Sequence, residues 1–141
     1  MASKNFRRSR RIVLCLIVCV ITTGLASRRD SRLFPQFLHD YPGDAFWAMA
    51  AYLGLVLFIP SIGVRRAAAG SLAISFAVEL SQLYHDDRID RIRRTLFGRL
   101  ILGSGFDWFD LIAYSTGILM IAVFDASVVI PCAERKERIG K

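Results

Sequence analysis

Four long apolar segments alternate with polar stretches along the chain. They occupy about residues 12–27, 44–60, 67–84 and 107–130. A helix that spans a membrane needs roughly 17–25 apolar residues, and backbone inside lipid must satisfy its hydrogen bonds within the segment. No period-two alternation indicates strands. The pattern predicts an all-α fold: one membrane domain over residues 1–141, a polytopic bundle of four transmembrane helices.

The connections between these segments carry patterns of their own. Ile89, Ile92 and Leu96 recur at helical spacing among Arg and Asp residues, which is typical of an amphipathic helix at a membrane interface. The stretch GRLILGSG, residues 98–105, follows, and its glycine-bracketed apolar residues predict a short re-entrant turn. Before the second helix, YPGD at residues 41–44 is expected to break the chain.

The first apolar segment allows two interpretations. Its basic start, its short apolar core and the Gly-Leu-Ala that precedes Ser27 also fit a cleavable secretory signal. Ser9, Arg10 and Arg11 are compatible with a twin-arginine signal. We expect an uncleaved anchor, because the other segments need the membrane in any case, and keep the signal peptide as the alternative.

Composition and charge agree with a membrane protein. The 141 residues are 54% hydrophobic and carry a net charge of +7, and the charges cluster between the apolar segments. A nucleic-acid binder needs a basic face on a soluble core, so we expect membrane lipids as partners and no nucleic acid. Basic residues precede the first helix, lie in the turn between helices two and three, and follow the fourth helix. The positive-inside rule therefore predicts N-in and C-in topology, with basic cytoplasmic tails, in a cell inner membrane.

The third segment contains ionisable and polar residues that do not suit lipid. Glu79 lies about 20 Å along this helix, which is inside a hydrocarbon core about 30 Å thick. Ser75, Glu79 and Gln82 share one helix face because they are spaced i, i+4, i+7. A carboxylate facing lipid costs several kcal/mol, so we expect this face to point into the bundle.

Other helices bring polar residues to the same depth, near the outer interface. Each also has a structural interpretation: Asp44 and Asp107 suit helix N-termini, Asp110 suits a first turn, and Trp47 suits an aromatic belt. Glu79 has two readings, a buried ion pair with Arg93 or Arg94 or a group that binds a ligand or handles protons. The candidate ligand-binding residues are Glu79, Gln82, Arg93, Asp110, Tyr114, Asp44 and Trp47.

The sequence contains no complete motif for catalysis, cofactor binding or metal binding. His85, Asp86 and Asp87 are residue types that bind metals, but they do not complete a ligand set. The three cysteines have neither zinc nor disulfide spacing. We therefore expect no cofactor and no metal, and the sequence identifies no catalytic residue.

Three stretches resemble a known family. They are GDAFWA at residues 43–48, FAVELSQLY at 76–84 and IRRTLFGRLILGSGFDWFDLIAYSTG at 92–117. Together they resemble the DUF2809 family of small bacterial membrane proteins of unknown function, which is distantly similar to the VanZ family. The resemblance implies an envelope role without a defined reaction. The positions it singles out are Asp44, Trp47, Glu79, Gln82, Arg93, Gly98, Gly103, Phe106, Asp110 and Tyr114.

Three functions stay open. The first is an envelope membrane protein whose outer-facing polar pocket binds a lipid or polar headgroup. The second is a membrane-embedded enzyme in which Glu79 and Asp110 form an acid–base pair acting on a lipid-linked substrate. The third is an accessory subunit that packs a partner membrane protein on a glycine face at Gly54 or Gly117.

Overall fold

The computed structural model describes residues 7–29, 41–84, 86–95, 98 and 107–139. Every regular element in these ranges is helical, which confirms the all-α class. In chain order, the elements are α1 (Arg10–Arg29), α2 (Tyr41–Phe58), α3 (Val64–Ser81), α4 (Asp87–Arg93), α6 (Trp108–Phe124), the π-helix η2 (Asp125–Val129) and α7 (Ile130–Ile139).

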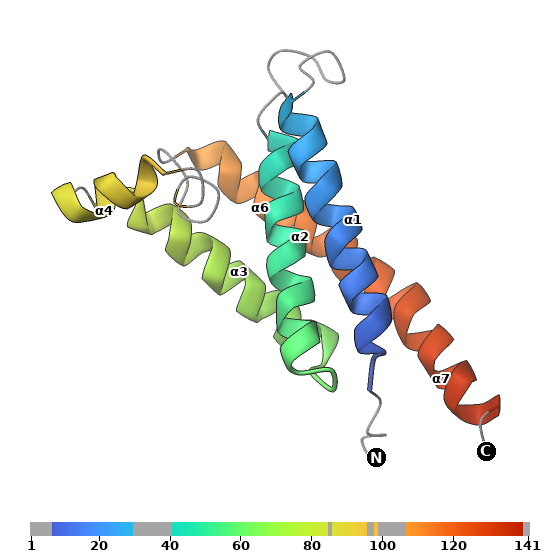
Figure 1. Cartoon of the computed structure of the whole chain (residues 1–141). Helices are drawn as coiled ribbons and strands as arrows, with labels where there is room; N and C mark the ends of the chain where they lie inside the picture. Colours follow the sequence, from blue (N-terminus) through green and yellow to red (C-terminus); the bar gives the residue numbers. More distant parts are fainter. Residues whose placement is uncertain (1–6, 30–40, 85, 96–97, 99–106, 140–141) are drawn as a thin grey trace.

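Figure 1 shows how these helices are arranged. Helices α1 and α2 lie side by side, and α6 crosses behind them and continues through η2 into α7. Helix α3 leans away from α2 toward its own C-terminal end, where α4 follows. The start of α1, the turn from α2 to α3 and the end of α7 lie at one end, here called the inner end. The opposite end, where α3 stops and α6 begins, is the outer end.

Helix α2 forms the centre of the bundle, since it contacts α1, α3 and α6. Two glycines set its distance from its neighbours. A Cβ on Gly117 of α6 would lie 2.4 Å from the backbone oxygen of Ala45, and a Cβ on Gly24 of α1 would lie 2.9 Å from the Cβ of Phe46. Gly117 therefore packs inside this chain, whereas a Cβ on Gly54 would meet no atom within 4 Å among the described residues.

The helices differ from the expected boundaries at two places. Helix α2 begins at Tyr41, so YPGD is its first turn and the prediction of a chain break there was wrong. Proline is tolerated in a first turn because its missing N–H would have no helical partner there. The fourth helix was expected to end near residue 130, but the helical path continues to Ile139.

The π-helix η2 lies where the fourth helix was expected to end. The backbone N–H of Ile130 donates to the carbonyl of Asp125, which is the wide turn of a π-helix. Pro131 follows directly. A proline has no N–H to donate and its ring crowds the preceding turn, so a widened turn at this point lets the helix continue. Asp125 and Val129 are buried on the inward side of η2.

A helix of 7 residues, α4, follows α3 where an amphipathic helix was expected; the apolar positions 96 and 97 of that expectation lie outside the described residues. Asp86 is the N-cap of α4, and its side chain accepts a hydrogen bond of 2.9 Å from the backbone N–H of Arg88. The acid therefore has a capping role. The re-entrant turn expected over residues 98–105 lies outside the described residues, apart from Gly98.

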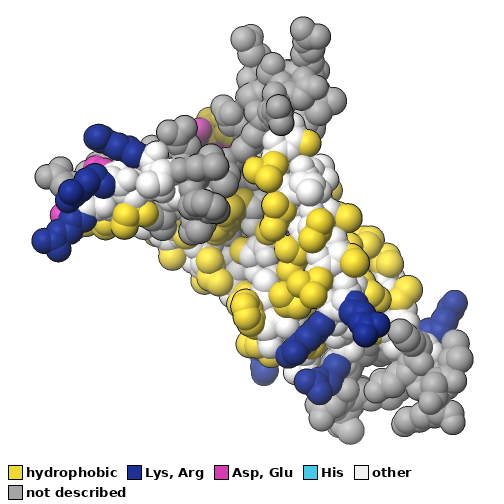
Figure 2. Space-filling view, viewed as in Figure 1, with side chains coloured by type: hydrophobic (Ala, Val, Ile, Leu, Met, Phe, Trp, Pro, Cys, Tyr) yellow, Lys and Arg dark blue, Asp and Glu magenta, His cyan; other side chains and the backbone are white. Residues whose placement is uncertain are grey.

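The surface of the bundle is strongly apolar. Within the described ranges, two helical stretches are long and apolar enough to cross a membrane, Arg10–Ser27 and Trp108–Ala133. Figure 2 shows hydrophobic side chains over the middle of the molecule, with Lys and Arg gathered at the inner end and around α4. Large apolar residues exposed on this surface include Leu14, Val18, Leu25, Phe58, Ile74, Leu80, Leu119, Met120 and Val123.

Candidate functional site at the outer end of the bundle

Helix α3 turns its polar face inward and its apolar face outward. Ser71, Ser75 and Glu79 are all 0% exposed. Ile74 and Leu80 are exposed on the opposite side. This is the reverse of a helix on the surface of a soluble protein, and it confirms the prediction that the Glu79 face points into the bundle.

Glu79 lies at the centre of a set of hydrogen bonds from three parts of the chain. Its Oε2 accepts from the Tyr114 hydroxyl at 2.9 Å and from Gln82 Nε2 at 3.2 Å. Its Oε1 accepts from the backbone N–H of Asp107 at 2.8 Å. In all three contacts Glu79 accepts the hydrogen bond. The carboxylate thereby joins the end of α3 to the start and the second turn of α6.

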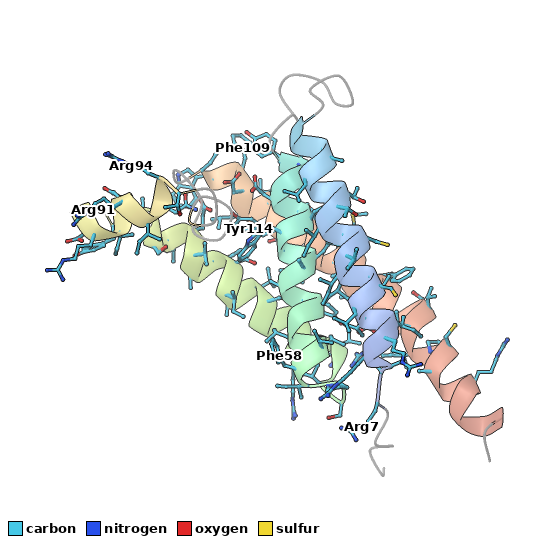
Figure 3. The ribbon with its side chains drawn as sticks, in the orientation of Figure 1. Arg7, Phe58, Arg91, Arg94, Phe109 and Tyr114 are labelled. Atoms are coloured by element: carbon cyan, nitrogen blue, oxygen red, sulfur yellow. The ribbon has the colours of Figure 1, made fainter. Side chains whose placement is uncertain are left out.

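The remaining candidate residues surround this carboxylate. The rings of Trp47 and Tyr114 contact each other with centroids 6.0 Å apart, so α2 also takes part. Asp44 and Asp110 lie within electrostatic range of the Tyr114 hydroxyl and are half-buried. Figure 3 places the Tyr114 side chain between the ribbons of α2 and α3. We call this set the outer cluster: Asp44, Trp47, Glu79, Gln82, Asp110 and Tyr114.

Two polar atoms in this region have no hydrogen-bond partner among the described residues. They are Gln82 Oε1 and Ser75 Oγ, although Gln82 is only 4% exposed and Ser75 is fully buried. Buried side-chain oxygens in folded proteins nearly always have a partner. Gln82 uses its Nε2 on Glu79, which leaves its carbonyl oxygen directed elsewhere. Gln82 Oε1 within the outer cluster and Ser75 Oγ beside it therefore distinguish this region from ordinary helix packing.

Asp107 has the capping role predicted for it, whereas Asp44 is not an N-cap, because α2 begins three residues earlier at Tyr41. Asp107 is the N-cap of α6, and its side chain accepts a 3.0 Å hydrogen bond from the backbone N–H of Phe109. Asp110 and Asp44 lie in the first turns of α6 and α2, where a negative charge is favourable. The expected ion pair of Glu79 with Arg94 is absent from the described contacts, and Arg94, the C-cap of α4, is exposed (Figure 3). The Arg93 side chain lies outside the described residues.

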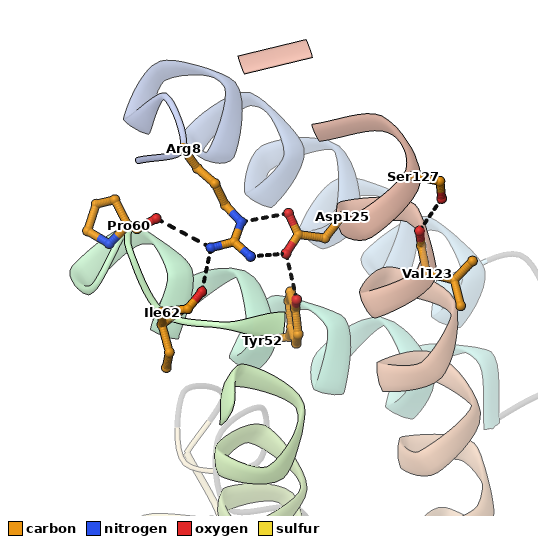
Figure 4. Close-up of polar contacts among 7 residues, drawn as sticks. All are labelled: Arg8, Tyr52, Pro60, Ile62, Val123, Asp125 and Ser127. Carbon is orange, nitrogen blue, oxygen red and sulfur yellow. Dashed lines mark hydrogen bonds and ion pairs between the residues drawn. The ribbon is translucent and has the colours of Figure 1, made fainter. Parts of the chain in front are cut away.

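A second buried cluster lies toward the inner end and was not predicted. Arg8 donates from Nε and Nη2 to the two carboxylate oxygens of Asp125, both at 2.7 Å (Figure 4). Arg8 Nη1 donates to the carbonyls of Pro60 and Ile62 at 3.3 and 2.7 Å. The Tyr52 hydroxyl donates to Asp125 Oδ2 at 2.6 Å. We call Arg8, Tyr52 and Asp125 the inner cluster.

The inner cluster ties four parts of the chain together: the residues before α1, helix α2, the turn before α3, and η2. Arg8 is 3% exposed and Asp125 is 2% exposed. Arg8 is one of the basic residues before the first helix, where a cytoplasmic tail was expected, and its burial was not predicted. The available signal was Asp125 itself, a single acid inside an apolar segment, which in a membrane protein implies a buried partner. Sequence spacing alone does not identify that partner, since it lies 117 positions away.

The family comparison covers the outer cluster. Residues 33–118, more than half of the chain, match the model of a family described as "Protein of unknown function (DUF2809)". The chain belongs to the DUF2809 family. The DUF2809 match includes α2, α3 and α4 and most of α6, and with them every residue of the outer cluster. Arg8 and Asp125 lie outside it. No solved structure matches the chain.

Proposed function

We propose that this protein is a multi-pass membrane protein of the cell envelope that binds a polar lipid headgroup at its outer cluster. Four spans are proposed: α1, α2, α3 and the continuous α6–η2–α7. The observation that carries the proposal is the inverted character of α3, with a fully buried carboxylate among polar side chains and apolar residues on the outside. In water this arrangement would expose apolar surface and bury polar groups at once, whereas lipid accommodates both.

The proposed orientation is N-in and C-in in an inner membrane. It is supported by the basic residues that are exposed at the inner end. Lys and Arg residues next to membrane spans are usually found on the cytoplasmic side. The exposed basic residues at the inner end are Arg7, Arg10, Arg11, Arg65, Arg66 and Arg135.

Retention of α1 is part of the same proposal. If the first helix were cleaved as a signal, Arg8 would be lost and Asp125 would stay buried without its cation. Breaking a buried ion pair by removing one partner costs about 3–5 kcal/mol. The uncleaved anchor is therefore favoured over the signal peptide.

The headgroup is proposed to bind at the half-buried rim of the outer cluster. Asp44 and Asp110 supply carboxylate acceptors there, and the exposed Trp108 and Phe109 lie at the same end. Tryptophan and other amphipathic aromatics favour the headgroup layer. The carboxylates match hydroxyl or amine donors on the headgroup, and Glu79 with Tyr114 holds the ends of α3 and α6 beneath them.

The membrane placement is tested with the native cysteines. Cys15 and Cys19 are exposed on α1 and Cys132 is exposed on α7. In native membranes a water-soluble maleimide should modify Cys132 from the cytoplasmic side only, and should leave Cys15 and Cys19 unmodified until detergent and denaturant are added. Rapid modification of Cys15 and Cys19 in the absence of denaturant would mean that α1 faces water.

The binding proposal is tested by the lipids that the protein retains. The protein is purified from native membranes in a mild detergent, and the bound lipids are identified by native mass spectrometry. Glu79→Gln is expected to lose a lipid that the wild type retains, while Arg94→Gln, an exposed substitution at the same end, keeps it. Identical lipid profiles in the wild type and Glu79→Gln would contradict the binding proposal.

A further inference from the structure

The last two turns of α3 present a row of oxygen atoms that the bundle leaves incompletely bonded. Ser75, Glu79 and Gln82 follow one another on the same face at spacings of four and three residues. Neighbours at these spacings lie roughly 5–6 Å apart on a helix. Ser75 Oγ and Gln82 Oε1 have no described partner; along the helix Ser75 precedes Glu79 and Gln82 follows it, and Gln82 Nε2 contacts the carboxylate at 3.2 Å.

The described residues around this row contribute negative rather than positive charge. Glu79 receives only neutral donors in its described contacts: a hydroxyl, an amide and a backbone N–H. Asp44 and Asp110 add further negative charge within range of Tyr114. The row also lies at the C-terminal end of α3, where Gln82 is the C-cap, and the C-terminal end of a helix carries partial negative charge.

We propose that Ser75, Glu79 and Gln82 form a binding site for one small monovalent cation, Na⁺. This inference rests on the membrane placement proposed above, because the cost of an uncompensated carboxylate is largest away from water. Hard cations prefer carboxylate, carbonyl and hydroxyl oxygens. Helix C-terminal ends in membrane proteins coordinate Na⁺ in this manner.

The donor set and its burial favour Na⁺ over other occupants. Among the described residues, no group of three His, Cys, Asp or Glu side chains has the geometry to hold a metal ion, whereas divalent cations such as Ca²⁺ usually take several carboxylates. An amine headgroup is too large for side chains that are at most 4% exposed. A buried water would complete the hydrogen bonds but would leave the charge of Glu79 unchanged.

The two serines of α3 provide a matched pair for the test. Ser71 and Ser75 are both fully buried on the same face. Ser71 Oγ donates to the Ala67 carbonyl at 2.9 Å, whereas Ser75 Oγ has no described partner. Ser75→Ala therefore removes a proposed ligand without breaking a described hydrogen bond, and it should fold. Ser71→Ala makes the same chemical change one turn away from the site.

The experiment measures the thermal midpoint, Tm, of the purified full-length protein in detergent, with NaCl replaced by choline chloride at constant ionic strength. A ligand that binds only the folded state raises Tm by mass action. At 100 times its dissociation constant we expect a rise of about 5–10 °C for the wild type and for Ser71→Ala. Ser75→Ala and Glu79→Gln should show no rise.

Two results would overturn the cation site. One is a wild-type Tm that is equal in sodium and choline, which would favour a trapped water. The other is a sodium-dependent rise that persists equally in Ser75→Ala and Ser71→Ala. The lipid experiment distinguishes this site from the headgroup site. If Glu79→Gln loses a lipid but the wild type shows no sodium response, headgroup binding alone is supported. If the wild type responds to sodium but retains no lipid, the ion site alone is supported.

Discussion

The inner and outer clusters are both built around a carboxylate that accepts a hydrogen bond from a tyrosine hydroxyl. Asp125 accepts from Tyr52 at 2.6 Å, and Glu79 accepts from Tyr114 at 2.9 Å. The difference lies in the remaining partners. Asp125 has a bidentate guanidinium from Arg8, whereas the other described donors to Glu79 are an amide and a backbone N–H.

This difference is the basis for proposing a structural role for the inner cluster and a binding role for the outer cluster. The Arg8 guanidinium donates hydrogen bonds to Asp125 and to two carbonyls of the α2–α3 turn. The charge of Asp125 is therefore balanced by Arg8, and both of its carboxylate oxygens accept hydrogen bonds. In the outer cluster, Glu79 has no cationic partner among the described contacts, and Gln82 Oε1 has no described hydrogen-bond partner; the same holds for Ser75 Oγ, one turn before Glu79. A fully matched buried network fixes one packing arrangement, whereas an incompletely matched one has capacity for a ligand.

The largest effect is expected from breaking the inner ion pair. Arg8→Ala or Asp125→Ala leaves one charge buried alone and should reduce the free energy of unfolding by about 3–5 kcal/mol. Denaturant titration of the purified protein in detergent measures this loss. The exposed neighbour substitution Arg7→Ala should change it by less than about 0.5 kcal/mol. Single substitutions at Arg8 that cost no more than Arg7→Ala would remove the structural role assigned to the inner cluster.

A double substitution sharpens the same point. Arg8→Met combined with Asp125→Leu removes both charges, and apolar replacements of a buried ion pair are often neutral or stabilising. The double variant should therefore be more stable than either single alanine variant, by at least about 2 kcal/mol. A double variant as unstable as the sum of the singles would show that the two residues act independently.

The second effect concerns the close approach of α2 and α6 beneath the outer cluster. Gly117→Ala places a Cβ 2.4 Å from the Ala45 carbonyl oxygen, so the helices must separate, at a cost of about 1–3 kcal/mol. Gly54→Ala meets open space and gains helix propensity of up to about 1 kcal/mol. The difference in Tm between the two variants measures this contrast, and equal values would contradict the packing described for Gly117.

A smaller difference in stability is expected between variants of the two tyrosines. Tyr114→Phe removes one of the few described donors to Glu79 and should cost about 1.5–3 kcal/mol, the range for a hydrogen bond to a charged group. Tyr52→Phe leaves Asp125 with its guanidinium and should cost about 0.5–1.5 kcal/mol. Unfolding free energies of the two variants, measured side by side, check this order. A larger loss for Tyr52→Phe would reverse the assignment of the two clusters.

The smallest effect is expected at Arg94. Arg94 is exposed and has no buried partner among the described residues, so its replacement by glutamine should change the stability by less than about 0.5 kcal/mol. An ion pair that pins α4 to Glu79 would instead cost several kcal/mol when broken. The same denaturant titration distinguishes these two results.

Much of the fold followed from the sequence because long apolar segments in a chain of this length leave few alternatives. The helical class and the inward face of α3 were both predicted from spacing, since Ser75, Glu79 and Gln82 lie on one face of a helix in any helical arrangement. The predicted start of α2 was less accurate. Pro42 and Gly43 suggested a break, yet both residues fit a first turn, because that turn makes few backbone hydrogen bonds of its own.

The two clusters were not equally predictable. The outer cluster draws on residues near helix ends, whose depth follows from counting turns, and its acids have recognisable capping positions. The inner cluster depends on a contact between Arg8 and Asp125 across nearly the whole chain, and on a π-turn that directs Asp125 inward. Neither the Arg8–Asp125 contact nor the π-turn is indicated by a local sequence pattern. The distant similarity to VanZ and the re-entrant turn stay predictions.

The most direct test of the contrast replaces each carboxylate by its amide. Asp125→Asn and Glu79→Gln are expressed alike, and the folded protein in the membrane fraction is measured by size-exclusion chromatography in detergent. We predict that Asp125→Asn loses most of its folded protein, because Arg8 is left buried without a counter-charge. Glu79→Gln should accumulate at about the wild-type level, since the amide keeps an acceptor for Tyr114. Equal loss of folded protein in both variants would contradict the distinction between the two clusters.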